Sequence, residues 1–150
     1  MFSKIIATGS YLPENIVTNR DLEQQIDTTD EWIRSRTGIE QRRIASIDQN
    51  TSDLAYEAAN RAIDKAEIAA ESIDLIIVGT CTPDVVTPNV GTIIQERLGI
   101  KNSAAFSVEA ACSGFIYAMN IADKFIRSRD SSCALVVGAD TLSRITLSRI

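Results

Sequence analysis

The chain has 150 residues, of which 45% are hydrophobic, enough to form one compact globular domain with a buried core over residues 1–150. Its 15 basic and 20 acidic residues leave a net charge of −5 and include no basic run, so we expect no nucleic-acid partner. The apolar run before Gly9 is too short for a signal peptide or a membrane span, so we expect a cytoplasmic protein.

The first expected strand is KIIATG, residues 4–9, a continuous apolar run typical of a sheet covered on both faces. A helix follows in TTDEWIRSRTG. Thr28 and Glu31 stand there in capping-box spacing, and Gly38 marks the end of the helix.

Trp32, the only tryptophan, lies on this helix close to Arg34 and Arg36, and two interpretations are open. An indole beside guanidinium groups is suited to stack on a nucleotide base and to meet its phosphates. Alternatively, an amphipathic helix packs its one aromatic side chain against the protein body.

The next elements alternate between helix and strand. Apolar residues recur at helical spacing over residues 52–68, and DLIIVGTC, residues 74–81, follows as a second buried strand. PNVGTIIQERLG then predicts a helix with Pro88 at its start and Gly99 after its end.

The last predicted strands are AAFSV, residues 104–108, and CALVVGA, residues 133–139, with a helix between them that ends near Ser128. Strand, helix, strand, helix, strand in this order predicts an α/β fold. We therefore expect a mostly parallel sheet with right-handed crossovers and helices on both faces.

Cys112 lies where the third strand turns into the last helix. At a helix N-terminus the dipole and free backbone N–H groups stabilise a thiolate and lower the pKa of the thiol. The small neighbours, Ala110, Ala111, Ser113 and Gly114, leave room for an acyl group and for N–H groups that face an oxyanion. A buried structural cysteine remains the alternative.

The other chemistry-bearing side chains are few. Cys81 and Cys133 lie in or beside apolar strands and are expected to be structural. Three widely spaced cysteines fit neither a disulfide framework nor a zinc site, so any cysteine chemistry is thiol chemistry. Histidine is absent, which removes the commonest general base and metal ligand.

The segments DEWIRSRTGI and AACSGF, together with TPDVVTPNVGTIIQERLGI and ALVVGADTLSR, resemble β-ketoacyl-acyl-carrier-protein synthase III. This thiolase-fold family starts bacterial type II fatty-acid synthesis. The resemblance covers residues 2 to about 145, the N-terminal half of the duplicated fold. It implies that Cys112 is the nucleophile, which takes an acyl group from acetyl-CoA or another acyl-CoA and condenses it with malonyl-acyl carrier protein.

The resemblance also implies the binding residues and partners. Trp32 and Arg36 would contact the adenine and phosphate end of coenzyme A, with Thr28 near the adenine. Val86 and Thr87 would border the acyl pocket of the partner subunit in a homodimer. No metal, organic cofactor, nucleic acid or membrane is implied.

The sequence departs from the family pattern near its end. Family members carry a histidine and an asparagine in a second half, which this chain lacks, and TLSRI at residues 141–145 is repeated at 146–150. Two further functions therefore stay open. One is a truncated, catalytically silent binding or assembly module, and the other is a related polyketide or quinolone priming enzyme.

Overall fold

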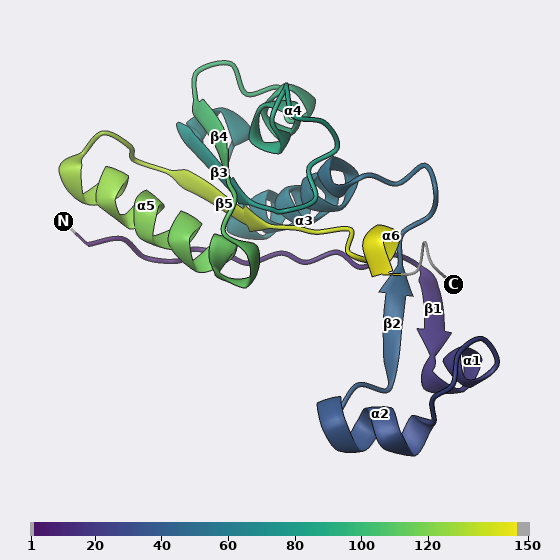
Figure 1. The fold of residues 1–150 in the computed structure, drawn as a ribbon. Coiled ribbons are helices and arrows are strands. Elements are labelled where there is room, and N and C mark those ends of the chain that lie inside the picture. Colours follow the sequence, from purple (N-terminus) through teal and green to yellow (C-terminus); the bar gives the residue numbers. More distant parts are fainter. Residues whose placement is uncertain (1, 147–150) are drawn as a thin grey trace. The chain divides into compact units, whose positions relative to one another are not determined.

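The computed structural model describes residues 2–146, whose elements Figure 1 labels in chain order. The chain divides into two compact units. The described part of the first unit comprises residues 2–11 and 50–140, and that of the second comprises residues 12–49 and 141–146.

The first unit is built on a parallel sheet in which β3 (Leu75–Gly79) lies between β4 (Ala104–Val108) and β5 (Ala134–Gly138). Leu75 stands opposite both Ala104 and Ala134, so all three strands end at the same edge of the sheet. The three strands coincide with three of the predicted apolar runs. The expected α/β class with a parallel sheet is confirmed.

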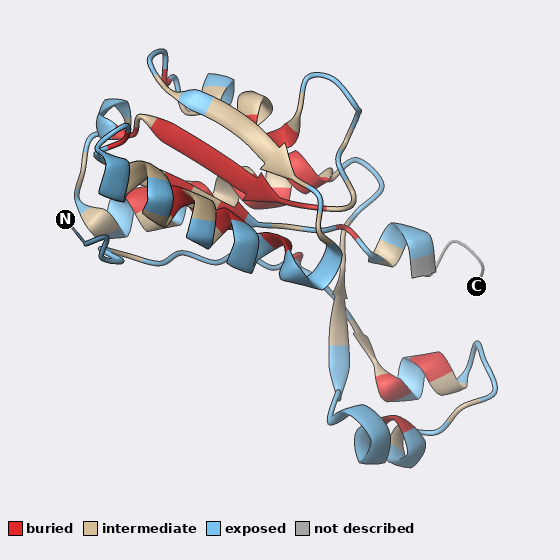
Figure 2. Ribbon diagram, turned by 60° about the vertical axis from the view of Figure 1, so that its left-hand side comes forward, coloured by how far each residue is buried: buried red, intermediate tan, exposed pale blue. Residues whose placement is uncertain are grey.

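The central strand β3 sends alternate side chains into two cores, and all five of its residues are buried (Figure 2). Ile76 and Val78 pack with helices α3 (Thr51–Ala66) and α4 (Val90–Arg97). Leu75 and Ile77 pack with α5 (Gly114–Ser128) on the other face. Because both faces are covered, the strand is apolar throughout.

Local capping sets the helix boundaries. The N–H of Asn50 donates to the Asp53 side chain at 2.7 Å, where α3 begins. The side chain of Asn89 caps α4 by accepting from the Thr92 N–H at 3.1 Å. Pro88 therefore precedes the cap instead of starting the helix, and the prediction that it lies at the helix start was wrong.

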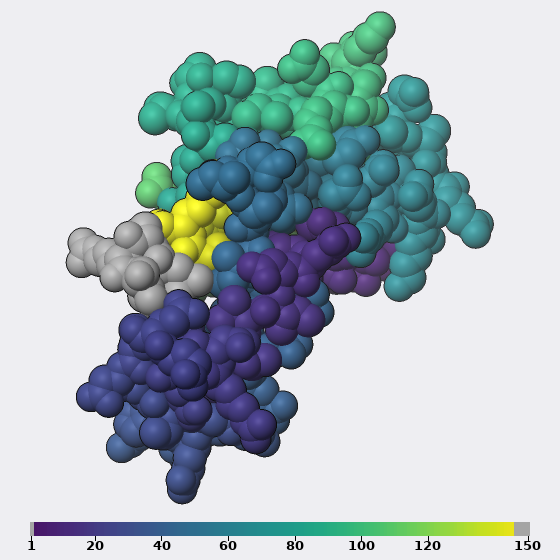
Figure 3. All heavy atoms as spheres, turned by 90° about the vertical axis from the view of Figure 1, so that its right-hand side faces the viewer, coloured from purple at the N-terminus to yellow at the C-terminus, as the bar shows by residue number. Residues whose placement is uncertain are grey.

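The prediction of a strand over residues 4–9 was also wrong. No strand among the described residues pairs with this segment, and a cavity of about 920 Å³ is lined by both the segment and β5. Side-chain contacts hold it instead. Ser3 Oγ donates to Asp123 at 2.6 Å, and Arg61 donates to the Ser10 carbonyl at 3.0 Å and lies over the Tyr11 ring. Figure 3 shows atoms of these first residues, in purple, against those of α3.

The second unit contains two antiparallel strands, β1 (Asn15–Thr18) and β2 (Gln41–Ile44), and the helices α1 (Asn19–Glu23), α2 (Asp30–Thr37) and α6 (Ser143–Thr146). Leu22 and Ile33 are its buried large apolar side chains among the described residues. Two 3₁₀ turns in the first unit, Ala70–Ser72 and Ala111–Ser113, complete the described elements. Residues 147–150 of the repeated TLSRI lie outside the described residues.

Candidate active site

Cys112 lies in the 3₁₀ turn between β4 and α5, and its side chain is exposed. The turn begins in backbone conformations that non-glycine residues rarely adopt, because Ala111 has φ +42°. The Ser113 N–H donates to the Ala110 carbonyl at 3.0 Å and closes the turn. Such strain is typical of functional sites, where it holds a side chain in a set direction.

The start of α5 approaches the end of β3 very closely at two glycines. A Cβ on Gly79 would lie 2.5 Å from the carbonyl carbon of Gly114 and 2.7 Å from the N of Phe115. No side chain fits there, so the pair lets the helix begin directly beside the sheet edge. This contact places the Cys112 turn at the carboxyl ends of the parallel strands, where ligands of open α/β sheets usually bind.

Several hydrogen-bond donors converge on one carboxylate, that of Asp140, at the same edge of the sheet. Oδ1 of Asp140, two residues after β5, accepts hydrogen bonds from Thr80 Oγ1 at 3.1 Å, Thr82 Oγ1 at 3.0 Å and the Cys81 N–H at 2.9 Å. The Cys81 thiol also donates to this oxygen, with Sγ at 3.4 Å. The sequence analysis did not single out Asp140. Its position after a predicted strand could have pointed to it, because adjacent parallel strands bring the residues after their carboxyl ends together.

The two remaining thiols lie beside apolar strands, as predicted, but neither is fully buried. Cys81 follows the end of β3 and Cys133 precedes β5, and both are half-buried. The hydrogen bond to Asp140, followed by burial and the negative charge of that carboxylate, raises the pKa of the Cys81 thiol. Burial, followed by the charge of Asp74, raises the pKa of the Cys133 thiol.

The cavity of about 920 Å³ in the first unit opens onto the candidate nucleophile. Its lining includes Cys112, Phe115, Gly79 and Asp140. A cavity of this size falls within the range of small-molecule sites, and its walls are mostly apolar and small side chains. Cys112 is therefore an accessible thiol at the rim of an apolar hollow, which suits acceptance of an acyl group.

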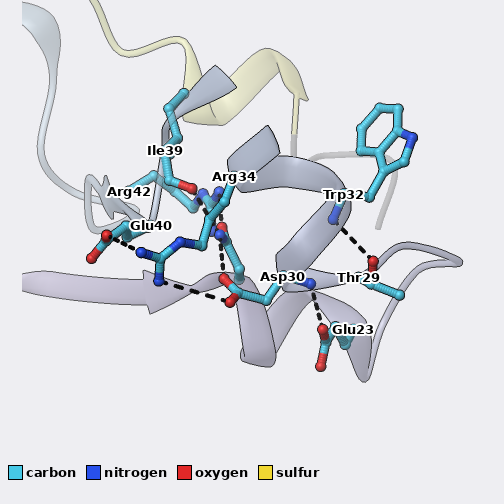
Figure 4. Close-up of polar contacts among 9 residues, drawn as sticks. Glu23, Thr29, Asp30, Trp32, Arg34, Ile39, Glu40 and Arg42 are labelled. Atoms are coloured by element: carbon cyan, nitrogen blue, oxygen red, sulfur yellow. Dashed lines mark hydrogen bonds and ion pairs between the residues drawn. The ribbon is translucent and has the colours of Figure 1, made fainter. Parts of the chain in front are cut away.

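Helix α2 carries the other predicted site residues. Thr29, not Thr28, is the N-cap, because its hydroxyl accepts from the Trp32 N–H at 3.1 Å (Figure 4). Thr28 is half-buried one residue earlier. Gly38 ends the helix with φ +72°, as predicted. The Trp32 side chain is 58% exposed and points away from the polar contacts of Figure 4, so it is not packed as an ordinary core aromatic.

A buried amide fixes this helix in the second unit. Asn19 is 1% exposed; its Nδ2 donates to Asp30 Oδ1 and to the Ile39 carbonyl, both at 2.7 Å, and its Oδ1 accepts from Arg42 at 2.8 Å. Arg34 of the same helix pairs at 2.8 Å with Glu40, which lies just before β2 (Figure 4). No sequence signal pointed to Asn19, since its partners come from three separate segments.

Arg36, the arginine predicted to bind phosphate, differs from Arg34 in its contacts. No hydrogen bond or ion pair of the Arg36 guanidinium is found among the described residues, and the residue is exposed. Val86 and Thr87 are exposed as well, with Val86 at 93%. The structure therefore places Trp32 and Arg36 on one helix, while Cys112 lies in the other unit.

The described residues contain neither a metal-binding cluster nor a membrane-spanning helix. Residues 2–146 contain no group of three or more histidine, cysteine, aspartate or glutamate side chains arranged to hold a metal ion. Within the same residues, no helix has the length and hydropathy needed to cross a bilayer.

Comparison with known proteins identifies the family. The protein-family model of 3-oxoacyl-[acyl-carrier-protein (ACP)] synthase III matches residues 106–147. The beta-ketoacyl-[acyl-carrier-protein] synthase III of Xanthomonas campestris pv. campestris (strain 8004) is 55% identical over 145 residues, which are 97% of this chain and 45% of that protein. The chain belongs to the β-ketoacyl-acyl-carrier-protein synthase III family.

Solved structures agree with this membership. The 3-oxoacyl-[acyl-carrier-protein] synthase III from Aquifex aeolicus VF5 has a TM-score of 0.91 at 48% identity, over 94% of this chain and 46% of that one. The priming β-ketosynthase from the R1128 polyketide biosynthetic pathway has a TM-score of 0.91 at 38% identity, over 95% and 42%. The thiolase-like fold expected for a synthase III is confirmed, and the chain spans about 45% of the length of its curated relative.

Proposed function

We propose that this chain supplies the acyl-accepting thiol and the coenzyme A-binding helix of a β-ketoacyl-acyl-carrier-protein synthase III. The observation that carries the proposal is Cys112, an exposed thiol on a strained turn beside an apolar cavity. Membership of the synthase III family supports the reaction type. The whole reaction joins an acetyl or other short acyl group to the malonyl unit of malonyl-acyl carrier protein and releases carbon dioxide.

In the first step, the Cys112 sulfur attacks the thioester carbonyl of acyl-CoA. The carbon–sulfur bond to coenzyme A breaks, and coenzyme A leaves as its thiol with the proton that Cys112 gives up. Backbone N–H groups at the start of α5 are available to donate to the oxyanion that forms. Condensation consumes the acyl-Cys112 thioester, and residues beyond this chain would supply its acid–base groups, because the chain has no histidine.

Helix α2 would hold the nucleotide end of coenzyme A. Two features of the helix support this role: Trp32 presents most of its indole to solvent, and Arg36 has an unpaired guanidinium among the described residues. Stacking of adenine on the indole and a charge-assisted bond to a phosphate would then fix the ligand. Thr28 is a weaker candidate for a contact near the adenine.

The remaining parts of the proposal follow the family. The partners are acyl-CoA, malonyl-acyl carrier protein and a second copy of the protein, with Val86 and Thr87 toward that copy. The reaction would take place in the cytoplasm, with no nucleic acid or membrane involved. It would use no metal or organic cofactor, as in the family, and acyl-CoA would be consumed as a substrate.

Acyl transfer can be tested on the chain itself. After incubation with acetyl-CoA, peptide mass mapping should find an acetyl group on Cys112, and Cys112→Ser should remove it. Arg127→Ala, which alters an exposed cation on α5, is the control variant. A chain that binds coenzyme A but never acquires an acetyl group would favour the silent binding module.

A second candidate is a polyketide priming enzyme. The likeness to the R1128 priming β-ketosynthase, at 38% identity, favours it. Both candidates share the transfer to Cys112, so acyl-CoAs of increasing length distinguish them. Transfer restricted to acetyl supports the fatty-acid enzyme, whereas preference for longer or branched acyl groups supports the polyketide enzyme.

A further inference from the structure

A second thiol, Cys81, lies at the same edge of the sheet as the proposed acyl-transfer site, and the reaction does not explain its role. Cys81 lies on the loop that follows β3, and the Thr80 N–H donates to the Val108 carbonyl at 3.2 Å, four residues before Cys112. Because β3 and its neighbour β4 end at the same edge of the sheet, Cys81 and Cys112 both follow strands at that edge. A second nucleophile at this place would compete for the acyl group.

We propose that Asp140 is a positioning residue that keeps Cys81 out of acyl transfer by holding its S–H as a hydrogen-bond donor. Cys112 is then the one thiol at the site that reacts with acyl-CoA. This inference rests on the proposed function, because it concerns selectivity between thiols at that same site.

The geometry around Asp140 favours the neutral thiol. One carboxylate oxygen receives donors from three consecutive residues, Thr80 to Thr82, and the thiol is one of these donors. A thiolate in the same position could not donate this hydrogen bond. Its sulfur would lie 3.4 Å from the negatively charged Asp140 oxygen. The arrangement therefore stabilises Cys81 in the form that is a poor nucleophile.

The loop is also fixed from its other side, so Cys81 stays with the carboxylate. Thr51, the first residue of α3, donates to the Thr82 carbonyl at 2.6 Å. The Ser52 N–H donates to the Asp84 side chain at 3.0 Å. Within residues 2–146, Asp140 is the titratable side chain that forms a hydrogen bond with the Cys81 thiol.

The direction of the electrostatic effect agrees with this role. The pKa of Cys81 is raised by its hydrogen bond to Asp140 first, then by burial and by the charge of that carboxylate. At neutral pH a raised pKa means a smaller thiolate fraction and slower reaction with electrophiles. Cys81 was expected to be structural, and the hydrogen bond to Asp140 gives a physical reason for low reactivity.

The test is Asp140→Asn in the full 150-residue chain, with Asp64→Asn on the exposed face of α3 as the charge-matched control. Iodoacetamide labelling followed by peptide mass mapping measures Cys81, Cys112 and Cys133 separately. We expect the ratio of Cys81 to Cys112 labelling to rise roughly threefold or more at neutral pH in Asp140→Asn, with no change in the control. With acetyl-CoA, Asp140→Asn should acquire acetyl groups on Cys81 as well.

The pH dependence of labelling gives a readout that a general loss of structure would not mimic. The midpoint of the Cys81 profile should lie above that of a free cysteine peptide in the wild-type chain and should fall in Asp140→Asn. An unchanged Cys81 ratio and midpoint in a folded variant would overturn the proposal. If Asp140→Asn unfolds, labelling of Cys133 becomes faster as well. The pH profile of Cys81 labelling in the wild-type chain is then the test. A midpoint at or below that of the free cysteine peptide rejects the role of Asp140.

Failure of the proposed function gives a different result. In that case Cys112 takes no acetyl group in either chain, while the effect of Asp140 on Cys81 alkylation is still measured. The two conclusions can therefore fail separately.

Discussion

Asp74, the residue before β3, connects the start of that strand to the residues that precede β5. Its carboxylate accepts from the Ser131 hydroxyl, from the Ser132 N–H at 2.8 Å and from the Cys133 N–H at 3.2 Å. Burial alone would raise the pKa of Asp74, but these hydrogen bonds outweigh burial and lower the pKa below its ordinary value of 3.8. The ionised carboxylate is therefore part of the folded structure.

A pH-dependent loss of stability follows for Asp74→Asn. A lowered folded-state pKa stabilises the fold above the ordinary pKa, and this stabilisation disappears as pH falls through the folded-state value. We expect Asp74→Asn to reduce the free energy of unfolding by about 1 to 3 kcal/mol near neutral pH, and by much less in acid. Urea unfolding near pH 7 and near pH 3 measures the difference.

The control for this experiment is Asp130→Asn, since Asp130 is exposed and its side chain accepts from one hydroxyl, that of Ser128. Its effect should be small at both pH values. An equal loss for Asp74→Asn in acid and at neutral pH would show that the carboxylate charge is not what stabilises this link.

At the level of single residues, the sequence predicted the position of Cys112 between a strand and a helix, because small residues and a change of pattern surround it. It could not identify the partners of Cys81, since a half-buried thiol after a strand looks the same with or without a carboxylate beside it. The cap of α2 was misplaced by one residue. Thr28 and Thr29 are both acceptable N-caps by type, and only the backbone conformation decides between them.

Helix α2 owes its place in the second unit to Asn19 and the groups around it. The amide orientation of Asn19 is defined by chemistry, because a flipped side chain would set Oδ1 against the Asp30 and Ile39 oxygens. Arg42 donates to the other atom of the amide. The helix thereby presents Trp32 outward from a supported position, with its indole exposed.

If adenine stacks on the exposed indole as proposed, binding of coenzyme A should quench the fluorescence of Trp32. Arg36→Ala should weaken this binding about tenfold, the scale of one charge-assisted phosphate contact. Titration of tryptophan emission with coenzyme A measures both. Arg127→Ala, a cation on α5 in the other unit, serves as the control and should leave the titration unchanged.

Emission that stays constant at millimolar coenzyme A would contradict the assignment of α2 as the nucleotide-end site. Equal affinities of the wild-type chain and Arg36→Ala would instead remove Arg36 alone from that site.

Among the elements, those with strong periodicity were predicted well. The strands β3, β4 and β5 and the helices α3 and α5 match their apolar patterns closely. The strands of the second unit were missed because β2 reads QRRI, whose two arginines carry no apolar signal. Their ladder depends on pairing between segments far apart in sequence, which local patterns do not encode.

At the scale of the whole molecule, β4 and β5 are the two edge strands of the parallel sheet in the described residues. No strand of the described residues pairs with the outer side of β5. The Ala139 N–H donates to the Gly79 carbonyl, and the Cys133 carbonyl accepts from the Asp74 N–H. The backbone N–H and C=O groups of odd-numbered residues in and beside β5 therefore point toward β3. The N–H groups of Ala134, Val136 and Gly138 consequently point to the unpaired side.

We therefore expect the isolated chain to self-associate through this edge, since unpaired strand edges act as templates for further strands. Val136→Pro removes an outward N–H without breaking a bond to β3, and it should shift the chain toward monomer. Sedimentation velocity over a range of concentrations measures the change. Val137→Pro, which removes an inward N–H, is the matched control and should destabilise the fold instead.

A wild-type chain that stays monomeric at high concentration would reject this edge as an association site. Association that Val136→Pro leaves intact would assign it to another surface.

The division into two units has a practical consequence for unfolding experiments. The single tryptophan belongs to the second unit, while all three cysteines belong to the first. Tryptophan fluorescence therefore follows the second unit, and thiol trapping follows the first. Coincident denaturation curves from the two signals would establish cooperative unfolding, and separated curves would give the independent stability of each unit.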